Sequence, residues 1–154
     1  MMMRRWVPVV LAAALAATPA FAGPLPARGI SPEQMVEIMV KRGLPAKIGK
    51  DSDGTLIISS RVVDVNFDVY FYECAAGYCR DIQFAAGWSD ANATPERVNE
   101  WNTTKRFVRA YWKAGNVLWA EQDARISRGT TENIGEQLAL WPQMLSEFKQ
   151  FMHL

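Results

Sequence analysis

The stretch DVNFDVYFYECAAGYCRDIQFAAGW, from Asp64 to Trp88, decides the fold of this chain. Apolar and polar side chains alternate on both sides of its centre, which is typical of two strands that each bury one face. The alternating apolar residues are Val65, Phe67, Val69 and Phe71 before the centre, and Ile82, Phe84, Ala86 and Trp88 after it. The sequence therefore predicts a β-hairpin with a single buried face.

Two cysteines indicate the register of this hairpin. If Cys74 lies opposite Cys79, residues 75–78 form the loop, and pairs such as Phe71 with Ile82 and Val65 with Trp88 bring every apolar position to one face. A slip of one residue would turn one apolar set toward water. The spacing C-x4-C is not the redox spacing C-x-x-C, and the chain lacks the further ligands of a zinc site. We therefore predict a structural disulfide between Cys74 and Cys79.

The first 22 residues have the pattern of a secretory signal peptide. Arg4 and Arg5 form a basic start, residues 6–17 are an apolar run, and a small-x-small cleavage pattern ends at Ala22. The run is too short to remain as a transmembrane helix. We expect cleavage after Ala22, a flexible linker over 23–30, and a periplasmic or secreted mature protein without a membrane span. A disulfide fits such an oxidising compartment.

The charge of the chain argues against nucleic acid as a partner. The chain has 17 Lys and Arg against 16 Asp and Glu, and cleavage would remove Arg4 and Arg5, which leaves a net charge of about −1. Nucleic acids and anionic membrane surfaces both bind to a concentrated basic face. We therefore expect neither as a partner.

Residues 31–154 predict a single α+β domain. Ser31-Pro32-Glu33-Gln34 and Thr94-Pro95 are helix starts, and apolar residues recur at helical spacing over 131–152. Strands are expected at 46–50, 55–62, 107–113 and 117–123, in addition to the central hairpin. The expected order is α-β-β-β-β-α-β-β-α, an antiparallel sheet built from hairpins with N-terminal, middle and C-terminal helices. We expect the first and last helices to cover one face of the sheet and the other face to be at least partly open.

The second hairpin, over 107–123, is ambiguous, because both of its faces carry apolar residues. The sequence does not decide which face is buried. Trp112 and Trp119 flank its turn, and we interpret them as neighbours across the strands in the core.

Residues with catalytic chemistry are sparse. The single histidine, His153, is the penultimate residue, so neither a catalytic triad nor a metal site can be built around it. We therefore predict a protein with no enzymatic activity, no catalytic residues, no metal and no cofactor. Two alternatives stay open: a structural envelope stress protein with no dedicated ligand, and a small envelope enzyme with a carboxylate-based site. The enzyme would need acids to converge, and the candidates are Asp64, Asp68, Asp81 and Asp123.

The polar face of the central hairpin is the candidate binding surface. Exposed tyrosines with interleaved acidic residues are a common composition of recognition surfaces. Equally, the last helix or a second subunit could cover these residues. The candidate surface consists of Tyr70, Tyr72, Asp81 and Gln83. Its partner would be a protein or peptide that the sequence does not identify.

Three segments resemble the YbjN family, whose members are described as bacterial sensory transduction regulators. They are WNTTKRFVRAYW at 101–112, QLALWPQMLSEFKQF at 137–151, and FDVYFYEC and CRDIQFAAGW in the central hairpin. The resemblance covers residues 31–152. It implies a fold similar to that of type III secretion chaperones, small α+β proteins that often form homodimers and bind extended protein segments. The signal peptide and the cysteine pair depart from a cytoplasmic chaperone, and the family brings no catalytic residues. We expect a non-enzymatic binding module with a regulatory or chaperone-like role.

Overall fold

The computed structural model describes residues 28–89 and 91–154, so the predicted signal peptide and residues 23–27 of the predicted linker lie outside the described residues. In chain order the elements are α1 (Pro32–Lys41), β1 (Lys47–Lys50), β2 (Leu56–Val62), β3 (Val65–Ala75), β4 (Tyr78–Ser89), α2 (Pro95–Thr104), β5 (Arg109–Lys113), β6 (Val117–Arg125) and α3 (Thr131–Met152). The predicted α+β class and the order α-β-β-β-β-α-β-β-α are confirmed.

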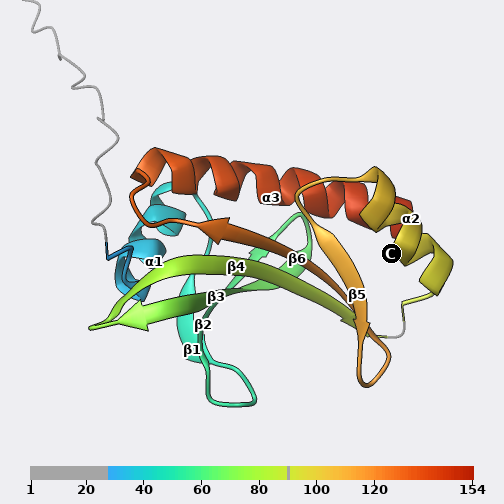
Figure 1. Cartoon of the computed structure of the whole chain (residues 1–154), viewed down its shortest axis with the longest axis horizontal. Coiled ribbons are helices and arrows are strands. Elements are labelled where there is room, and N and C mark those ends of the chain that lie inside the picture. The colour runs from blue at the N-terminus through green and yellow to red at the C-terminus, as the bar shows by residue number, and fades with distance from the viewer. Residues whose placement is uncertain (1–27, 90) are drawn as a thin grey trace, which may run out of the picture.

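The six strands form one antiparallel sheet in the order β1-β2-β3-β4-β6-β5. The long helix α3 runs along one face of this sheet, with α1 toward one of its ends and α2 toward the other (Figure 1). None of the helices in residues 28–89 and 91–154 lies on the opposite face, which is called the open face below (Figure 1).

The core lies between α3 and the sheet. The apolar stripe of α3 is buried, as its periodicity predicts. Trp141 of α3 stacks on Phe84 of β4, with ring centroids 5.7 Å apart, and meets the edge of Phe67 of β3 at 6.0 Å. Trp101 of α2 packs edge-on against Phe148 at 5.0 Å, which joins α2 to α3. Burying a large side chain of this kind contributes roughly 1.5–3 kcal/mol to stability.

The central hairpin has the predicted register over most of its length. The pairs run from Asp68↔Ala85 to Ala75↔Tyr78 and include Cys74↔Cys79. The prediction of a four-residue loop is wrong, because Ala76 and Gly77 both have positive φ and form a two-residue turn of the kind that suits twisted strands. The predicted pair of Val65 with Trp88 is also wrong. Beyond Asp68 the strands diverge, since the start of β3 stays paired with β2 and the end of β4 with β6.

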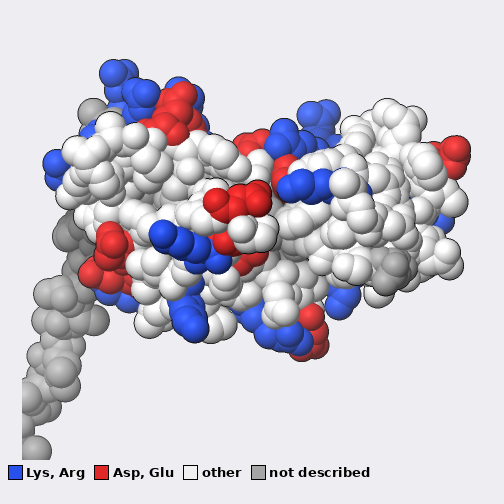
Figure 2. Space-filling view, turned by 90° about the horizontal axis from the view of Figure 1, so that it is seen from below, with Lys and Arg blue, Asp and Glu red and all other residues white. Residues whose placement is uncertain are grey.

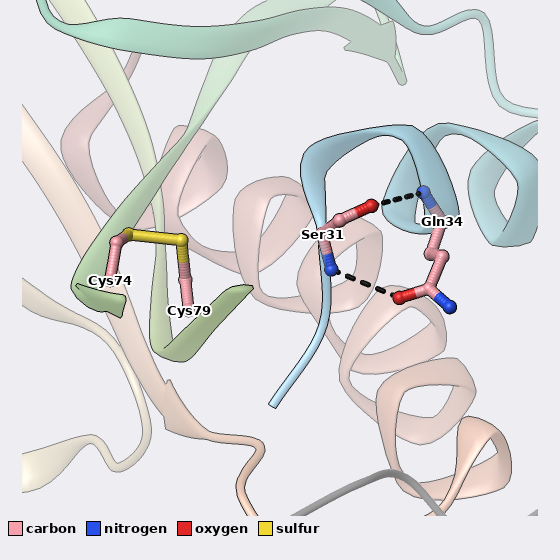
Figure 3. Close-up of a disulfide and its surroundings, with 4 residues drawn as sticks. All are labelled: Ser31, Gln34, Cys74 and Cys79. Atoms are coloured by element: carbon pink, nitrogen blue, oxygen red, sulfur yellow. Dashed lines mark hydrogen bonds between the residues drawn. A yellow bond between two sulfur atoms is a disulfide. The ribbon is translucent and has the colours of Figure 1, made fainter. Parts of the chain in front are cut away.

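The tip of the central hairpin is hydrogen-bonded to residues at the start of the described chain. Cys74 and Cys79 are joined by a disulfide beside the N-terminus of α1, where Ser31 and Gln34 cap the helix reciprocally (Figure 3). On the other side of Cys79, its N–H donates to the Ile30 carbonyl at 2.8 Å and its carbonyl accepts from the Ile30 N–H at 3.0 Å. Ile30 is completely buried. The last residues of the predicted linker are therefore bound to the domain.

Gly29 permits this close approach. Its φ is +91°, and a Cβ at this position would lie 1.8 Å from the Cys79 carbonyl oxygen. Gly43, just after α1, also has a positive φ, +78°, but a Cβ there would meet nothing within 4 Å. The two glycines thus share a left-handed backbone and differ in the space around it.

We expect Gly29→Ala to destabilise the protein more than Gly43→Ala does. Gly43→Ala carries only the left-handed penalty of about 1–2 kcal/mol. Gly29→Ala adds the loss of two hydrogen bonds, about 1 kcal/mol each, and the release of Ile30 from the core. Urea unfolding of the two variants measures the difference, and equal losses would show that residues 28–30 do not stabilise the hairpin tip.

Candidate functional site

The structure shows which face of the second hairpin is buried. In β5 and β6 the even-numbered residues face the helices: Leu118 and Ala120 are completely buried, and the Gln122 amide donates to Gln137 of α3 at 2.7 Å. The odd-numbered residues therefore face the open side of the sheet. They are Arg109, Tyr111, Lys113, Val117, Trp119, Glu121, Asp123 and Arg125.

Two adjoining hollows lie on the open face, and we call them together the open-face groove. The larger, of about 560 Å³, is lined by Tyr72, Glu73, Asp81, Ile82, Gln83, Arg109, Asp123, Ala124 and Arg125. The smaller, of about 270 Å³, is lined by Asp51, Tyr70, Tyr72, Gln83, Arg109, Tyr111, Lys113, Trp119 and Glu121. The groove reaches the β1–β2 turn at Asp51 and the end of β5 at Lys113. Figure 2 shows this face, with charged side chains of both signs gathered over its middle.

A buried carboxylate forms the centre of the groove. The side chain of Glu121 is only 7% exposed. Its Oε2 accepts hydrogen bonds from Nη2 and Nε of Arg109, at 2.7 and 3.0 Å, and its Oε1 accepts one from the Tyr111 hydroxyl at 2.6 Å. A buried charge is tolerated only when it is paired and hydrogen-bonded in this way. The guanidinium of Arg109 is thereby held in one orientation, although Arg109 itself is more than half exposed.

The network continues across β6 and β4 to β3. Nη1 of Arg109 lies 3.4 Å from Oδ2 of Asp123, whose Oδ1 accepts from the Gln83 amide at 2.8 Å. Oε1 of Gln83 in turn accepts from the Tyr72 hydroxyl at 3.2 Å. Side chains from four neighbouring strands are therefore linked by hydrogen bonds and by the ion pair between Arg109 and Asp123. This network fixes the donors and acceptors of the groove in advance of any ligand.

The phenols of the groove remain protonated at neutral pH. Burial raises the pKa of Tyr70 and of Tyr72, and nearby carboxylates add to the effect, Asp68 for Tyr70 and Glu121 for Tyr72. Burial, together with the hydrogen bond to Glu121, raises the pKa of Tyr111 to about 12. The hydrogen bonds to Glu121 also raise the pKa of Arg109. The groove thus presents neutral phenol hydroxyls beside fixed charges of both signs.

All four residues of the candidate surface line the groove. The last helix does not cover them, because α3 lies on the other face of the sheet (Figure 1). Two of them differ from the expectation of free polar groups: Gln83 is buried, and Asp81 is paired with Arg125, whose Nε lies 3.0 Å from Oδ1. Tyr70 is half-buried and Tyr72 is exposed.

Sequence reasoning missed the half of the groove that β5 and β6 supply. The interpretation of both tryptophans as core residues is wrong for Trp119. Trp112 packs against the core, whereas Trp119 lies on the open face over Gly87, with the Lys113 ammonium 5.2 Å from its ring centroid. The sequence did contain a signal for this face, because polar residues occupy alternate positions in both strands. They are Arg109, Tyr111, Glu121 and Asp123, all at odd-numbered positions. A large tryptophan on each face obscured this alternation.

The four acids of the carboxylate-enzyme alternative are distributed over several partners. Asp81 and Asp123 line the larger hollow, but each faces an arginine. Asp68 accepts from Ser59 at 2.7 Å, and Asp64 lies 3.5 Å from Arg61 outside the groove. His153 is not a lining residue and contacts Arg97 instead. Paired carboxylates of this kind suit binding better than proton transfer.

Residues 28–89 and 91–154 contain no cluster of three or more His, Cys, Asp or Glu side chains placed to hold a metal ion. Among the helices described, none combines the length and the apolar character that crossing a membrane would require.

Comparison with known proteins identifies a family. A family model named YbjN, with the description "Putative bacterial sensory transduction regulator", matches residues 31–154. Neither the curated proteins nor the solved structures contain a match to the chain.

The raised pKa of Tyr111 leads to a prediction for alkaline pH. A group whose pKa is higher in the folded than in the unfolded state stabilises the fold below its unfolded pKa and loses this contribution as the pH rises through the folded value. Between pH 10 and about 12, the free energy of unfolding should therefore fall more steeply for the natural protein than for Tyr111→Phe.

Phenolate absorbance, recorded against pH, measures the titration directly. We expect Glu121→Gln to lower the pKa of Tyr111, because the charge-assisted hydrogen bond is lost, but to leave it above the ordinary value, because burial remains. Tyr78→Phe, at the hairpin tip, removes a phenol outside the groove and is the control. If the pKa of Tyr111 were the same in Glu121→Gln as in the natural protein, the contact between Tyr111 and Glu121 would be contradicted.

Proposed function

Because this chain belongs to the YbjN family, we propose that it is a non-enzymatic binding module that captures an extended segment of another protein in the open-face groove. The family is described by a regulatory role rather than by a reaction. The observation that carries the proposal is the polar network that lines the groove on the open face of the sheet. Hydrogen bonds join Tyr72, Gln83 and Asp123, an ion pair joins Asp123 to Arg109, and further hydrogen bonds join Arg109 to Glu121.

The composition of the groove favours a polypeptide as its ligand. The larger hollow, of about 560 Å³, has the size of a typical ligand pocket, and the smaller one extends it along the sheet. Phenol rings provide large contact areas with little loss of side-chain entropy, and the amide, guanidinium and carboxylate groups match the donors and acceptors of a peptide. Because the network already fixes these groups, a ligand would not have to order them on binding.

The proposed location is the periplasm or the outside of the cell. Residues 1–22 support it through their signal-peptide pattern. The disulfide between Cys74 and Cys79 supports it too, because disulfides persist in oxidising compartments. In that compartment a module that binds extended segments would have a regulatory or chaperone-like role.

A homodimer is the second part of the proposal and is supported by the resemblance to type III secretion chaperones. Light scattering on the purified protein should give twice the mass of one mature chain at micromolar concentration. A monomer mass over this whole range would remove the dimer without affecting the groove.

Capture from periplasmic extract tests the groove. With the purified protein as bait and mass spectrometry as the readout, we expect a stoichiometric protein partner. The double variant Tyr70→Ala, Tyr72→Ala should retain at most about one tenth of the amount of partner protein. The reason is that aromatic anchors of an interface contribute about 1–2 kcal/mol each or more. Tyr78→Ala, a tyrosine at the hairpin tip, is the matched control and should capture as the natural protein does. Equal capture by all three proteins would contradict the proposal.

A further inference from the structure

The two edges of the sheet are not equivalent. At the β5 edge the side-chain amide of Asn102 pairs with both backbone groups of Ala110: Nδ2 donates to the carbonyl at 2.8 Å, and Oδ1 accepts from the N–H at 2.8 Å. Trp101 Nε1 donates to the Val108 carbonyl, also at 2.8 Å. Asn102 thus takes the place that the backbone of a neighbouring strand would occupy, and α2 closes this edge.

The β1 edge has no such cover. β1 pairs only with β2, so half of its backbone N–H and C=O groups point away from the sheet. Within residues 28–89 and 91–154, no hydrogen bond reaches the outer side of Lys47–Lys50. Three of its four residues are exposed. An uncovered edge of this kind is a template for one more strand.

The side chains at this edge define what strand would fit. Lys47, opposite Ser59, points to the open face, and Lys50, opposite Leu56, points to the helix side. Ile48 lies on the same side as Lys50, and both Ile48 and Leu56 are 39% exposed. The edge therefore presents a cation on each face and an apolar contact between them.

We propose that the β1 edge binds an extended acidic segment of a partner protein, which adds to the six-stranded sheet as a further strand. The backbone pairing supplies affinity that does not depend on sequence, and the alternate side chains supply selectivity. Acidic residues beside Lys47 and Lys50 form favourable cross-strand pairs, and an apolar residue between them covers Ile48 and Leu56.

The two lysines of β1 determine which segment fits this edge. A basic segment would place its cations against Lys47 and Lys50. Like charges directly opposite each other on a sheet are destabilising. Lysines on a free edge commonly protect it from neutral strands as well, so an acidic segment is the occupant that this edge selects.

A defined peptide tests the β1 edge separately from the groove. The probe is the acetylated, amidated peptide Glu-Val-Val-Glu, titrated into the ¹⁵N-labelled protein. Its glutamates are three positions apart, as Lys47 and Lys50 are, so one lies opposite each lysine and a valine lies opposite Ile48. We expect saturable shifts of the amide signals of Lys47–Lys50. The peptide Lys-Val-Val-Lys should bind about tenfold more weakly, from two pairs that change from attraction to repulsion. The acidic peptide with N-methylated valines keeps the charge but cannot pair through these amides, so it should also bind less well.

Charge reversal completes the test. Lys47→Glu combined with Lys50→Glu should reverse the preference, so that the basic peptide binds more tightly than the acidic one. The control, Arg106→Glu combined with Arg128→Glu, changes the net charge equally at two exposed positions outside β1 and should leave the preference unchanged. Equal binding of both peptides, full binding by the N-methylated peptide, or shifts confined to the groove would each overturn the proposal. Because Tyr70 and Tyr72 are not part of this edge, failure here leaves the groove proposal standing, and the reverse also holds.

Discussion

The register between β3 and β4 is the constraint on which the rest of the molecule depends. It places Val69, Phe71, Ile82 and Phe84 together on the face that α3 covers, and the aromatic contacts of Trp141 follow from that placement. The same register places Tyr70 opposite Gln83 and Tyr72 opposite Asp81 on the other face. The core and the groove therefore lie on the two opposite faces of the same pair of strands, β3 and β4. A shift of one residue would remove both at once.

Glu121 and Arg109 illustrate how the open face differs from an ordinary solvated sheet. Replacing a buried ion pair with apolar residues is often neutral or stabilising, so such a pair is weak evidence for a role in stability. Here the pair fixes Arg109, Tyr111 and Asp123 in one arrangement. The half-buried Tyr70 and the exposed Tyr72 lie beside them. The open face therefore carries polar side chains that are already ordered. A polar, ordered surface of this kind is consistent with the binding of a ligand.

The backbone N–H and C=O groups at the edges of the sheet have different partners in different places. Asn102 closes the β5 edge, and Ile30 pairs with the part of β4 that β6 does not reach. The β1 edge carries two lysines, and no described residue bonds to its outer side. Among the described residues, α3 covers one face of the sheet, α2 closes the β5 edge, and Ile30 pairs with Cys79 at the hairpin tip (Figure 1). The groove and the β1 edge are accessible.

The sequence by itself determined the elements and most of the central register. Alternation, the paired cysteines, the Ser31 and Thr94 caps and the stripe of α3 are local signals, and local chemistry decides them. It could not determine the turn at Ala76-Gly77, where two positive φ angles shorten the loop. Only the tertiary structure decided which face of β5 and β6 is buried, because each face carries a tryptophan, Trp112 or Trp119, that could pack in the core. The position of α3 determines which of the two faces is buried. With that choice Arg109, Tyr111 and Glu121 joined Tyr72 and Gln83, residues far apart in sequence that only strand order could bring together.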